Sequence, residues 1–281
     1  MIRVVIDGHV HFWDIARQED ILVVRLRPEL QRSYLPKDLW PLITAHGVER
    51  VILVQAAPSP EHTRWCLDLA KREERVAGVV GWVDLEAPDV LDVLSAYRAE
   101  ARFVGIRAMA NRMAEPDWLM RQAVRTGFSA LARLDLTAEL LLRPAHLPAC
   151  LDLCRALPNL RVVIDHGGSP DIRAGGFQSW ATWIAEIGRT PSARLKLSGL
   201  IEAAGPGWTV EQLRPFFGHL LEGLGPKRLL FGSNWPVVEL AGNYHVWWET
   251  VCQLLDAFGL GAAQRGALFG GTATEVYRLP P

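Results

Sequence analysis

The sequence has few cysteines, no excess of charge of either sign and no long apolar run, and each absence narrows the possible functions. The four cysteines form no C-x-x-C pair and are predicted to be buried thiols in a reducing compartment. Lys and Arg number 30 against 31 Asp and Glu, so no nucleic-acid or anionic-membrane partner is expected. No stretch reaches the roughly 18 apolar residues of a membrane span, and the first residues predict a strand rather than a signal peptide. We expect a cytoplasmic protein.

The pattern of apolar residues predicts a parallel α/β fold. Hydrophobic residues make up 49% of the 281, which is ample for a large buried core. Strand-like runs alternate with helical patterns. The first predicted strand starts at Val4, and the others span 50–55, 76–83, 103–107, 139–143, 160–165, 194–199 and 228–231. Ser59 and Pro60 predict the start of one helix, and another is expected around 117–126. Barrels of about this length fold as one domain, and no G-x-G-x-x-G follows the first strand. The sequence therefore predicts one (β/α)₈ TIM barrel over residues 1–281, with no dinucleotide site.

Two histidines at the end of the first strand are the strongest functional signal. His9 and His11 are two residues apart, so in extended backbone both imidazoles project to the same side. Converging neutral imidazoles are ligands that Zn²⁺ accepts. Residues 15–40 lack clear periodicity, which predicts a functional loop over this site rather than a linker.

Polar residues also follow the later strands, where a barrel carries its functional groups. The predicted strand-end residues are Gln55, Arg107, Arg143, His166 and Asn234. So many polar strand ends are not expected from packing alone.

Four stretches resemble the amidohydrolase superfamily. They are Asp-Gly-His-Val-His-Phe-Trp-Asp at 7–14, Asp-His-Gly-Gly at 165–168, Lys-Leu-Ser-Gly-Leu at 196–200 and Gly-Ser-Asn-Trp-Pro at 232–236. They look most similar to the branch of sugar-acid lactonases and 2-pyrone-4,6-dicarboxylate lactonase. The resemblance covers essentially the whole chain and implies a (β/α)₈ barrel that hydrolyses a lactone ring. Some members hold a divalent metal on the first-strand histidines, and others work without one.

Asn234 departs from that resemblance, because the family usually has Asp at this position. That Asp binds metal where metal is present and takes a proton from the attacking water. An amide cannot act as a base near neutral pH and carries no charge to help a cation. Either another residue is the base, with His166 or Glu202 nearest by motif, or the protein is a binding module without catalysis, or the Asp was replaced to trap substrate. We expect partial or absent zinc occupancy.

The resemblance and the strand-end pattern together predict how the site works. Water attacks a lactone carbonyl that His9, His11 and His166 polarise, either through a metal or directly as hydrogen-bond donors. The expected partner is a small molecule, and the oligomeric state stays open. The alternatives are a metal-dependent decarboxylase of the same superfamily and a non-catalytic sugar-acid binder. The predicted site residues are His9, His11, His166 and Asn234 for catalysis, His9, His11 and His166 for metal, and Gln55, Arg107, Arg143, Trp13 and Trp235 for substrate.

Overall fold

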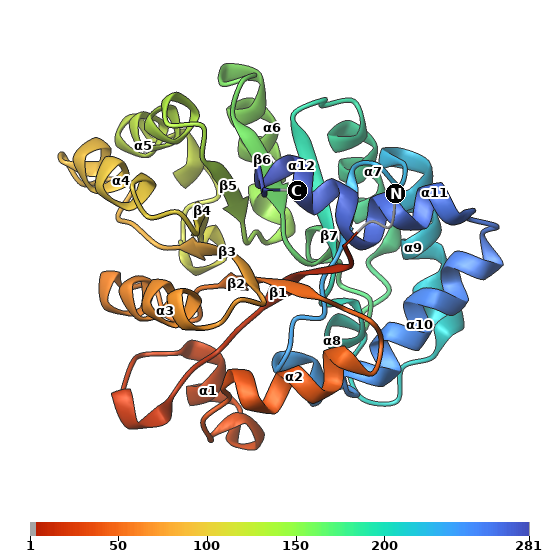
Figure 1. The fold of residues 1–281 in the computed structure, drawn as a ribbon. Coiled ribbons are helices and arrows are strands. Elements are labelled where there is room, and N and C mark those ends of the chain that lie inside the picture. Colours follow the sequence, from red (N-terminus) through yellow and green to blue (C-terminus); the bar gives the residue numbers. More distant parts are fainter. Residues whose placement is uncertain (1–3, 281) are drawn as a thin grey trace.

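Eight parallel strands form one sheet in chain order (Figure 1). The computed structural model describes residues 4–280. The strands are β1 (Ile6–Val10), β2 (Arg50–Val54), β3 (Val76–Gly81), β4 (Phe103–Ala108), β5 (Thr137–Leu140), β6 (Arg161–Ile164), β7 (Ala193–Leu197) and β8 (Leu229–Phe231). Nearly all their residues are buried, because helices cover the outside and side chains fill the lumen. This architecture confirms the predicted (β/α)₈ barrel.

Backbone and side-chain contacts join the segment after β8 to β1. The Asn234 amide donates to the His9 carbonyl at 2.9 Å, and the His11 amide donates to the Trp235 carbonyl at 2.7 Å. One oxygen of buried Asp7 also accepts from the amides of His9 and Ser233. These bonds set His9 and Asn234 beside each other, although they are more than 200 residues apart in sequence.

Helices follow the strands and cover the barrel. They are α1 (Leu22–Leu26), α2 (Pro36–Thr44), α3 (Pro60–Arg72), α4 (Val90–Arg98), α5 (Gln122–Arg133), α6 (Leu147–Ala156), α7 (Phe177–Gly188), α8 (Leu200–Ala204), α9 (Val210–Leu224), α10 (Tyr244–Ala257), α11 (Ala262–Gly266) and α12 (Thr272–Val276). The predicted start of α3 is correct: Ser59 accepts from the His62 amide and Pro60 takes the first helical position. None of the helices described over residues 4–280 is both long and apolar enough to cross a membrane.

Two predicted boundaries were wrong. β5 begins at Thr137 and ends at Leu140 rather than spanning 139–143, because the chain leaves the barrel wall there and continues into a 3₁₀ turn at Pro144–His146. The helix expected at 117–126 is a 3₁₀ turn at Trp118–Met120 followed by α5. The first error matters for function, because it moves Arg143 away from the strand end.

The C-terminal segment packs against the lumen at the end of the barrel opposite the site. Val276, Tyr277 and Leu279 form one apolar cluster with inward-facing residues of the strands, among them Ile6 and Val163. The Thr137 hydroxyl donates to the Val276 carbonyl at 2.7 Å, which ties this segment to β5. Tyr277 therefore reaches the interior beneath the histidines.

Candidate active site

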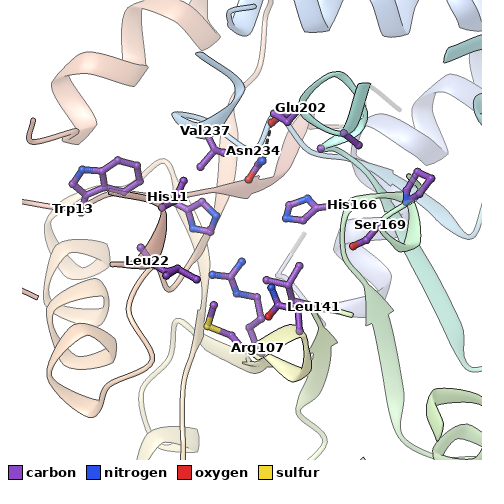
Figure 2. Close-up of a pocket in the computed structure, with 17 residues that line it drawn as sticks. His11, Trp13, Leu22, Arg107, Leu141, His166, Ser169, Glu202, Asn234 and Val237 are labelled. Carbon is purple, nitrogen blue, oxygen red and sulfur yellow. Dashed lines mark hydrogen bonds between the residues drawn. The ribbon is translucent and has the colours of Figure 1, made fainter. Parts of the chain in front are cut away.

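A pocket of about 320 Å³ lies at the C-terminal ends of the strands (Figure 2). This is the face that carries the active sites of such barrels, and the volume suits a small molecule. The polar side chains on its wall are His11, Arg107, Asn111, His166, Ser169, Glu202 and Asn234. Apolar side chains cover much of the rest, including Leu22, Val23, Met109 and Leu141. Leu22 and Val23 come from α1, so the segment predicted to lie over the site does contribute to it.

The two first-strand histidines lie in direct contact. Their Nε2 atoms are 3.1 Å apart and their rings are nearly perpendicular, at 87°. The Nδ1 atom of His11 lies 2.8 Å from the Val54 carbonyl. His9 belongs to β1 rather than following it, and its side chain is fully buried below the pocket wall.

His166 faces His11 across the pocket in Figure 2. Its ring centroid is 4.7 Å from that of His9, and its Nδ1 lies 2.9 Å from the Ser198 hydroxyl. Gly199 makes room for this ring, because a Cβ there would be 2.7 Å from the His166 Cβ. Its φ of +69° is also a conformation that glycine adopts readily.

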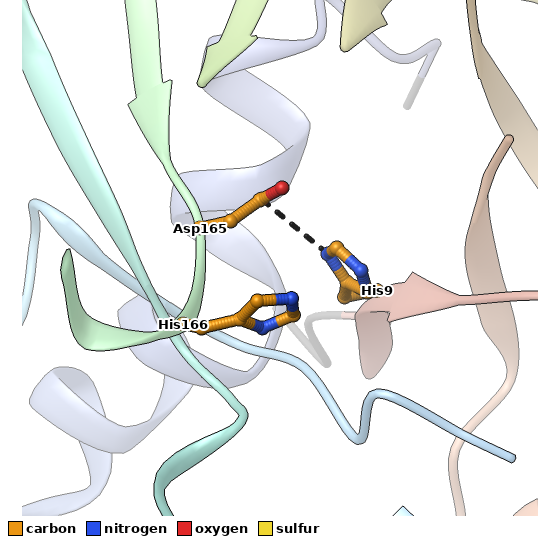
Figure 3. A group of neighbouring side chains, drawn as sticks. All are labelled: His9, Asp165 and His166. Carbon is orange, nitrogen blue, oxygen red and sulfur yellow. Dashed lines mark ion pairs between the residues drawn. The ribbon is translucent and has the colours of Figure 1, made fainter. Parts of the chain in front are cut away.

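A group of buried charged side chains lies beneath the histidines. The Lys196 ammonium is 2.7 Å from a Glu139 oxygen, 2.9 Å from His9 Nδ1 and 3.4 Å from an Asp165 oxygen. Asp165 is also 3.5 Å from His9 Nδ1, as the dashed line in Figure 3 marks. Tyr277 donates to Glu139 from below. Such buried charges are tolerated only with partners of opposite sign, so this group holds the floor of the site in one arrangement.

The site keeps its histidines neutral. Burial is the main cause that lowers the pKa of His9 well below its usual value, and the positive charge of Lys196 is the next largest. Burial, and then Arg107, do the same to the pKa of His11, and burial lowers the pKa of His166 to about 4. At neutral pH all three rings are therefore uncharged. His166 is for the same reason a weak base.

Arg107 and Asp165 carry the charge next to the pocket. Arg107 donates to the Gln55 carbonyl, and one of its terminal nitrogens is 3.8 Å from Asp165. Burial alone would raise the pKa of Asp165, but Lys196 and His9 hold it well below the usual range. Arg107 is 3% exposed, and its buried Nε has no hydrogen-bond partner within residues 4–280. A cation with unused donors on a pocket wall is suited to an oxyanion or carbonyl of a ligand.

Asn234 and Glu202 form a hydrogen-bonded pair on the opposite side (Figure 2). Asn234 Nδ2 donates to Glu202 Oε1 at 2.8 Å, and the other Glu202 oxygen has no partner among the described residues. Burial raises the pKa of Glu202 to about 7, although the Asn234 hydrogen bond opposes this shift. The backbone of Asn234 has a φ of +59°, a conformation that asparagine tolerates better than most residues. Glu202 is thus the pocket carboxyl best matched to proton transfer near neutral pH.

The structure brings some of the predicted site residues together and leaves others apart. His11, His166, Asn234, Arg107 and Trp13 line the pocket, and His9 contacts His11 just below.

Three predicted substrate-binding residues do not line the pocket. The Gln55 side-chain amide is buried and finds no hydrogen-bond partner in the described part of the chain, and the Trp235 ring packs against Phe12 and Tyr34. Arg143 is exposed and donates to the Met113 carbonyl, because β5 ends earlier than predicted.

Glu139, Asp165 and Tyr277, on the floor of the site, were not predicted from sequence, and for Lys196 the sequence indicates only that it can point into the lumen on the same side as Ser198. Glu139 and Lys196 lie inside apolar strands, where an isolated charge is costly, so their presence there is a signal for a paired interior site. Asp165 lies within the Asp-His-Gly-Gly motif at 165–168, but the motif alone does not predict its contacts with Lys196 and His9. Tyr277 has no local signal, since nothing in the C-terminal sequence indicates that it enters the lumen.

Comparison with known proteins identifies the family. The sequence profile of the amidohydrolase family matches residues 6–279. The chain belongs to the amidohydrolase family. This finding confirms the resemblance that the four motifs carried.

Two lactonase relatives of this amidohydrolase are similar to it over nearly their full length. It is 37% identical to an L-fucono-1,5-lactonase from Burkholderia ambifaria, over 98% of this chain and 95% of the relative. It is 32% identical to an L-fucono-1,5-lactonase from Burkholderia multivorans, over 98% and 96%. Crystal structures of a Burkholderia multivorans amidohydrolase, one with bound zinc and one with bound HEPES, superpose with a TM-score of 0.93 at 30% identity, over 99% of this chain and 100% of that one.

Proposed function

We propose that this amidohydrolase opens the lactone ring of a sugar acid by attack of water on the lactone carbonyl. The observation that carries the proposal is one small pocket with a cation, Arg107, on one side and a carboxyl of pKa about 7, Glu202, on the other. Ester hydrolysis needs both groups, since charge develops on the carbonyl oxygen while the water loses a proton. The near-full-length similarity to two lactonases supports the same reaction.

The proposed substrate is a six-carbon lactone that carries a methyl group. Leu22, Val23, Met109 and Leu141 give the pocket an apolar wall, which suits a methyl better than a hydroxyl. The names of the two lactonase relatives specify L-fuconate, a 6-deoxy sugar acid. Discrimination against the matching hydroxymethyl lactone should be modest, about 10- to 100-fold, because an apolar wall rejects a hydroxyl only weakly.

The steps follow from the groups on the wall. The Glu202 carboxylate takes a proton from water while the water oxygen bonds to the lactone carbon. Arg107 donates hydrogen bonds to the oxyanion of the tetrahedral intermediate. The intermediate collapses, the bond from carbon to ring oxygen breaks, and Glu202 returns its proton to the departing alkoxide. The neutral ring of His166 orients the substrate, and Asn234 holds Glu202 in place through its amide. The hydroxy acid product then releases one proton to solvent.

Zinc at partial or absent occupancy was expected on His9, His11 and His166, and the donor atoms are close enough for a cation. Two nitrogens on a tetrahedral zinc are about 3.3 Å apart, and the two Nε2 atoms here are 3.1 Å apart. The hydrogen bonds do not fit, however. Each ligating nitrogen must present a lone pair, whereas the Val54 carbonyl beside His11 and the Lys196 ammonium beside His9 favour a proton on one of these two nitrogens. No step of the proposed reaction therefore uses a metal.

A matched pair of substrates tests the proposal. L-Fucono-1,5-lactone and L-galactono-1,5-lactone differ only by the hydroxyl at C6, and their opening is followed with a pH indicator against the uncatalysed rate. We expect turnover of both, with kcat/KM about 10- to 100-fold higher for the first. Binding of L-fuconate without turnover of any lactone would favour the sugar-acid binder. Zinc-dependent release of CO₂ from 2,6-dihydroxybenzoate would favour the decarboxylase.

A further inference from the structure

The Lys196 side chain has no role in the reaction above, yet it is completely buried against His9. We propose that Lys196 is a positioning residue that holds His9 in the tautomer with its proton on Nε2, so that His9 and His11 form a hydrogen-bonded pair and reject a divalent cation. The inference rests on the proposed function only for its activity readout, since cation binding and tautomer are measured without a substrate.

The heavy-atom contacts define one consistent chain of hydrogen bonds. A carbonyl oxygen can only accept, so the His11 nitrogen 2.8 Å from the Val54 carbonyl carries a proton. In a neutral ring the other nitrogen, Nε2 of His11, then has a lone pair. His9 Nε2 lies 3.1 Å away and must donate to it. His9 Nδ1 consequently has a lone pair, and it accepts from the Lys196 ammonium at 2.9 Å.

The other tautomer of His9 meets two unfavourable contacts. A proton on Nδ1 would point at the Lys196 ammonium, which has only donors. Two lone pairs would then face each other across the 3.1 Å between the Nε2 atoms. A cation between them would relieve the second contact but worsen the first, because it adds positive charge to a ring that already borders an ammonium.

Lys196 has no freedom to move aside. Its ammonium lies 2.7 Å from Glu139, 2.9 Å from His9 and 3.4 Å from Asp165, and Tyr277 donates to Glu139 from the far side. A metal-bound histidine normally donates its second ring N–H to a carboxylate or carbonyl. His11 has such a partner in Val54. Asp165, 3.5 Å from His9 Nδ1, is the matching carboxylate, but Lys196 lies against the same oxygen.

Substitution of Lys196 tests this directly. Lys196→Met keeps an unbranched side chain of similar length but removes the ammonium, so His9 can donate from Nδ1 to Asp165. We expect the zinc affinity, measured by calorimetry on metal-free protein, to rise about 10- to 100-fold, the usual range for a change in the partner of a ligating histidine. Lys196→Arg keeps the donors and the positive charge, so its zinc affinity should stay as low as that of the parent. Lys227→Met, a control at an exposed lysine, should also leave the zinc affinity unchanged.

A spectroscopic measurement keeps the inference testable if Lys196→Met does not fold. In protein labelled with ¹⁵N-histidine, the parent should show His9 protonated at Nε2, and zinc at micromolar concentration should leave that signal unchanged. The signal is assigned with His9→Gln. A parent that binds one zinc as tightly as Lys196→Met, or a His9 that carries its proton on Nδ1, would overturn the inference. A parent with the expected tautomer but no lactonase activity would refute the proposed function and leave the role of Lys196 standing.

Discussion

Replacing Asn234 with Asp would place two carboxyl groups together in the site. The Asn234 nitrogen is 2.8 Å from a Glu202 oxygen, so Asn234→Asp brings two acidic oxygens to about that separation. Two carboxylates so close and so poorly solvated cannot both be ionised near neutral pH. The pair should hold one shared proton and behave as a dyad with two macroscopic pKa values.

The size of the effect follows from the geometry. Two unit charges about 4 Å apart interact by roughly 4 kcal/mol at an effective dielectric constant of about 20, which corresponds to about three pKa units between the two ionisations. A carboxyl group stabilises an adjacent carboxylate more than an amide N–H does. The first ionisation of the dyad should therefore fall below the pKa of about 7 that Glu202 has beside Asn234.

The pH dependence of kcat/KM for L-fucono-1,5-lactone is the measurement. The parent should lose activity as the pH falls through about 7, because Glu202 becomes protonated. In Asn234→Asp this acidic limb should move down by at least about one pH unit, which makes the variant the faster enzyme at pH 6. Glu202→Gln should lower kcat/KM by about 10²- to 10⁴-fold and abolish the limb.

The exchange variant, which combines Glu202→Gln with Asn234→Asp, keeps one amide and one carboxyl in the pair. It should recover at least about tenfold over Glu202→Gln alone if the carboxyl introduced at position 234 can serve as the base. If Glu202→Gln keeps most of the activity and still loses it as the pH falls through about 7, Glu202 is not the general base. His166 would then be the next residue to test.

Three further outcomes are expected. Arg107→Met should lower kcat/KM by about 10²- to 10³-fold, because the oxyanion loses its stabilisation. The control Arg189→Met, at a side chain that is 72% exposed, should keep the parent's kcat/KM. Equal rates in the two variants would exclude Arg107 from the chemistry. Gly199→Ala should lower both activity and Tm. Gly207→Ala, with a φ of +80° but no described atom within 4 Å of the added Cβ, should show only the backbone cost of about 1 kcal/mol. Identical losses in the two variants would mean that contact with His166 is unimportant. Burial opposes the charged form of His62, but Cys66 and Glu19 outweigh it and raise its pKa to about 9. The stabilisation that Cys66 and Glu19 give the charged ring is therefore complete below the unfolded pKa of about 6.5 and lost as pH rises through about 9. Denaturant unfolding of Glu19→Gln should accordingly differ from the parent at pH 6 but not at pH 10.

The sequence predicted the barrel and the histidine pair because those signals are local. A strand that ends in His-x-His fixes the side on which both rings lie, and Asn234 follows another strand of the same parallel sheet. The prediction failed for Arg143, because its placement depended on where β5 ends and not on its own residue type. Trp235 failed to reach the pocket wall for a similar reason: its neighbour Asn234 takes the wall position and the indole turns into the core.

The pairing of Glu202 with Asn234 and of Lys196 with His9 could not be derived from one sequence. Each depends on hydrogen bonds between elements that are distant in the chain, at 32 and 187 residues of separation. Residue type narrows the candidates, as a buried lysine must find acceptors. Only the three-dimensional arrangement says which acceptors it finds, and therefore which tautomer its histidine takes.

The hydrogen bond from Tyr277 to Glu139 gives the site an unusual order of assembly. His9 is made long before Tyr277, which supports the group under its lysine. The growing chain must therefore hold Glu139 and Lys196 without this donor until Tyr277 has been made. A truncation that removes Tyr277, on the face of the barrel remote from the substrate, would disturb the chemistry at the other face as well as the stability of the fold.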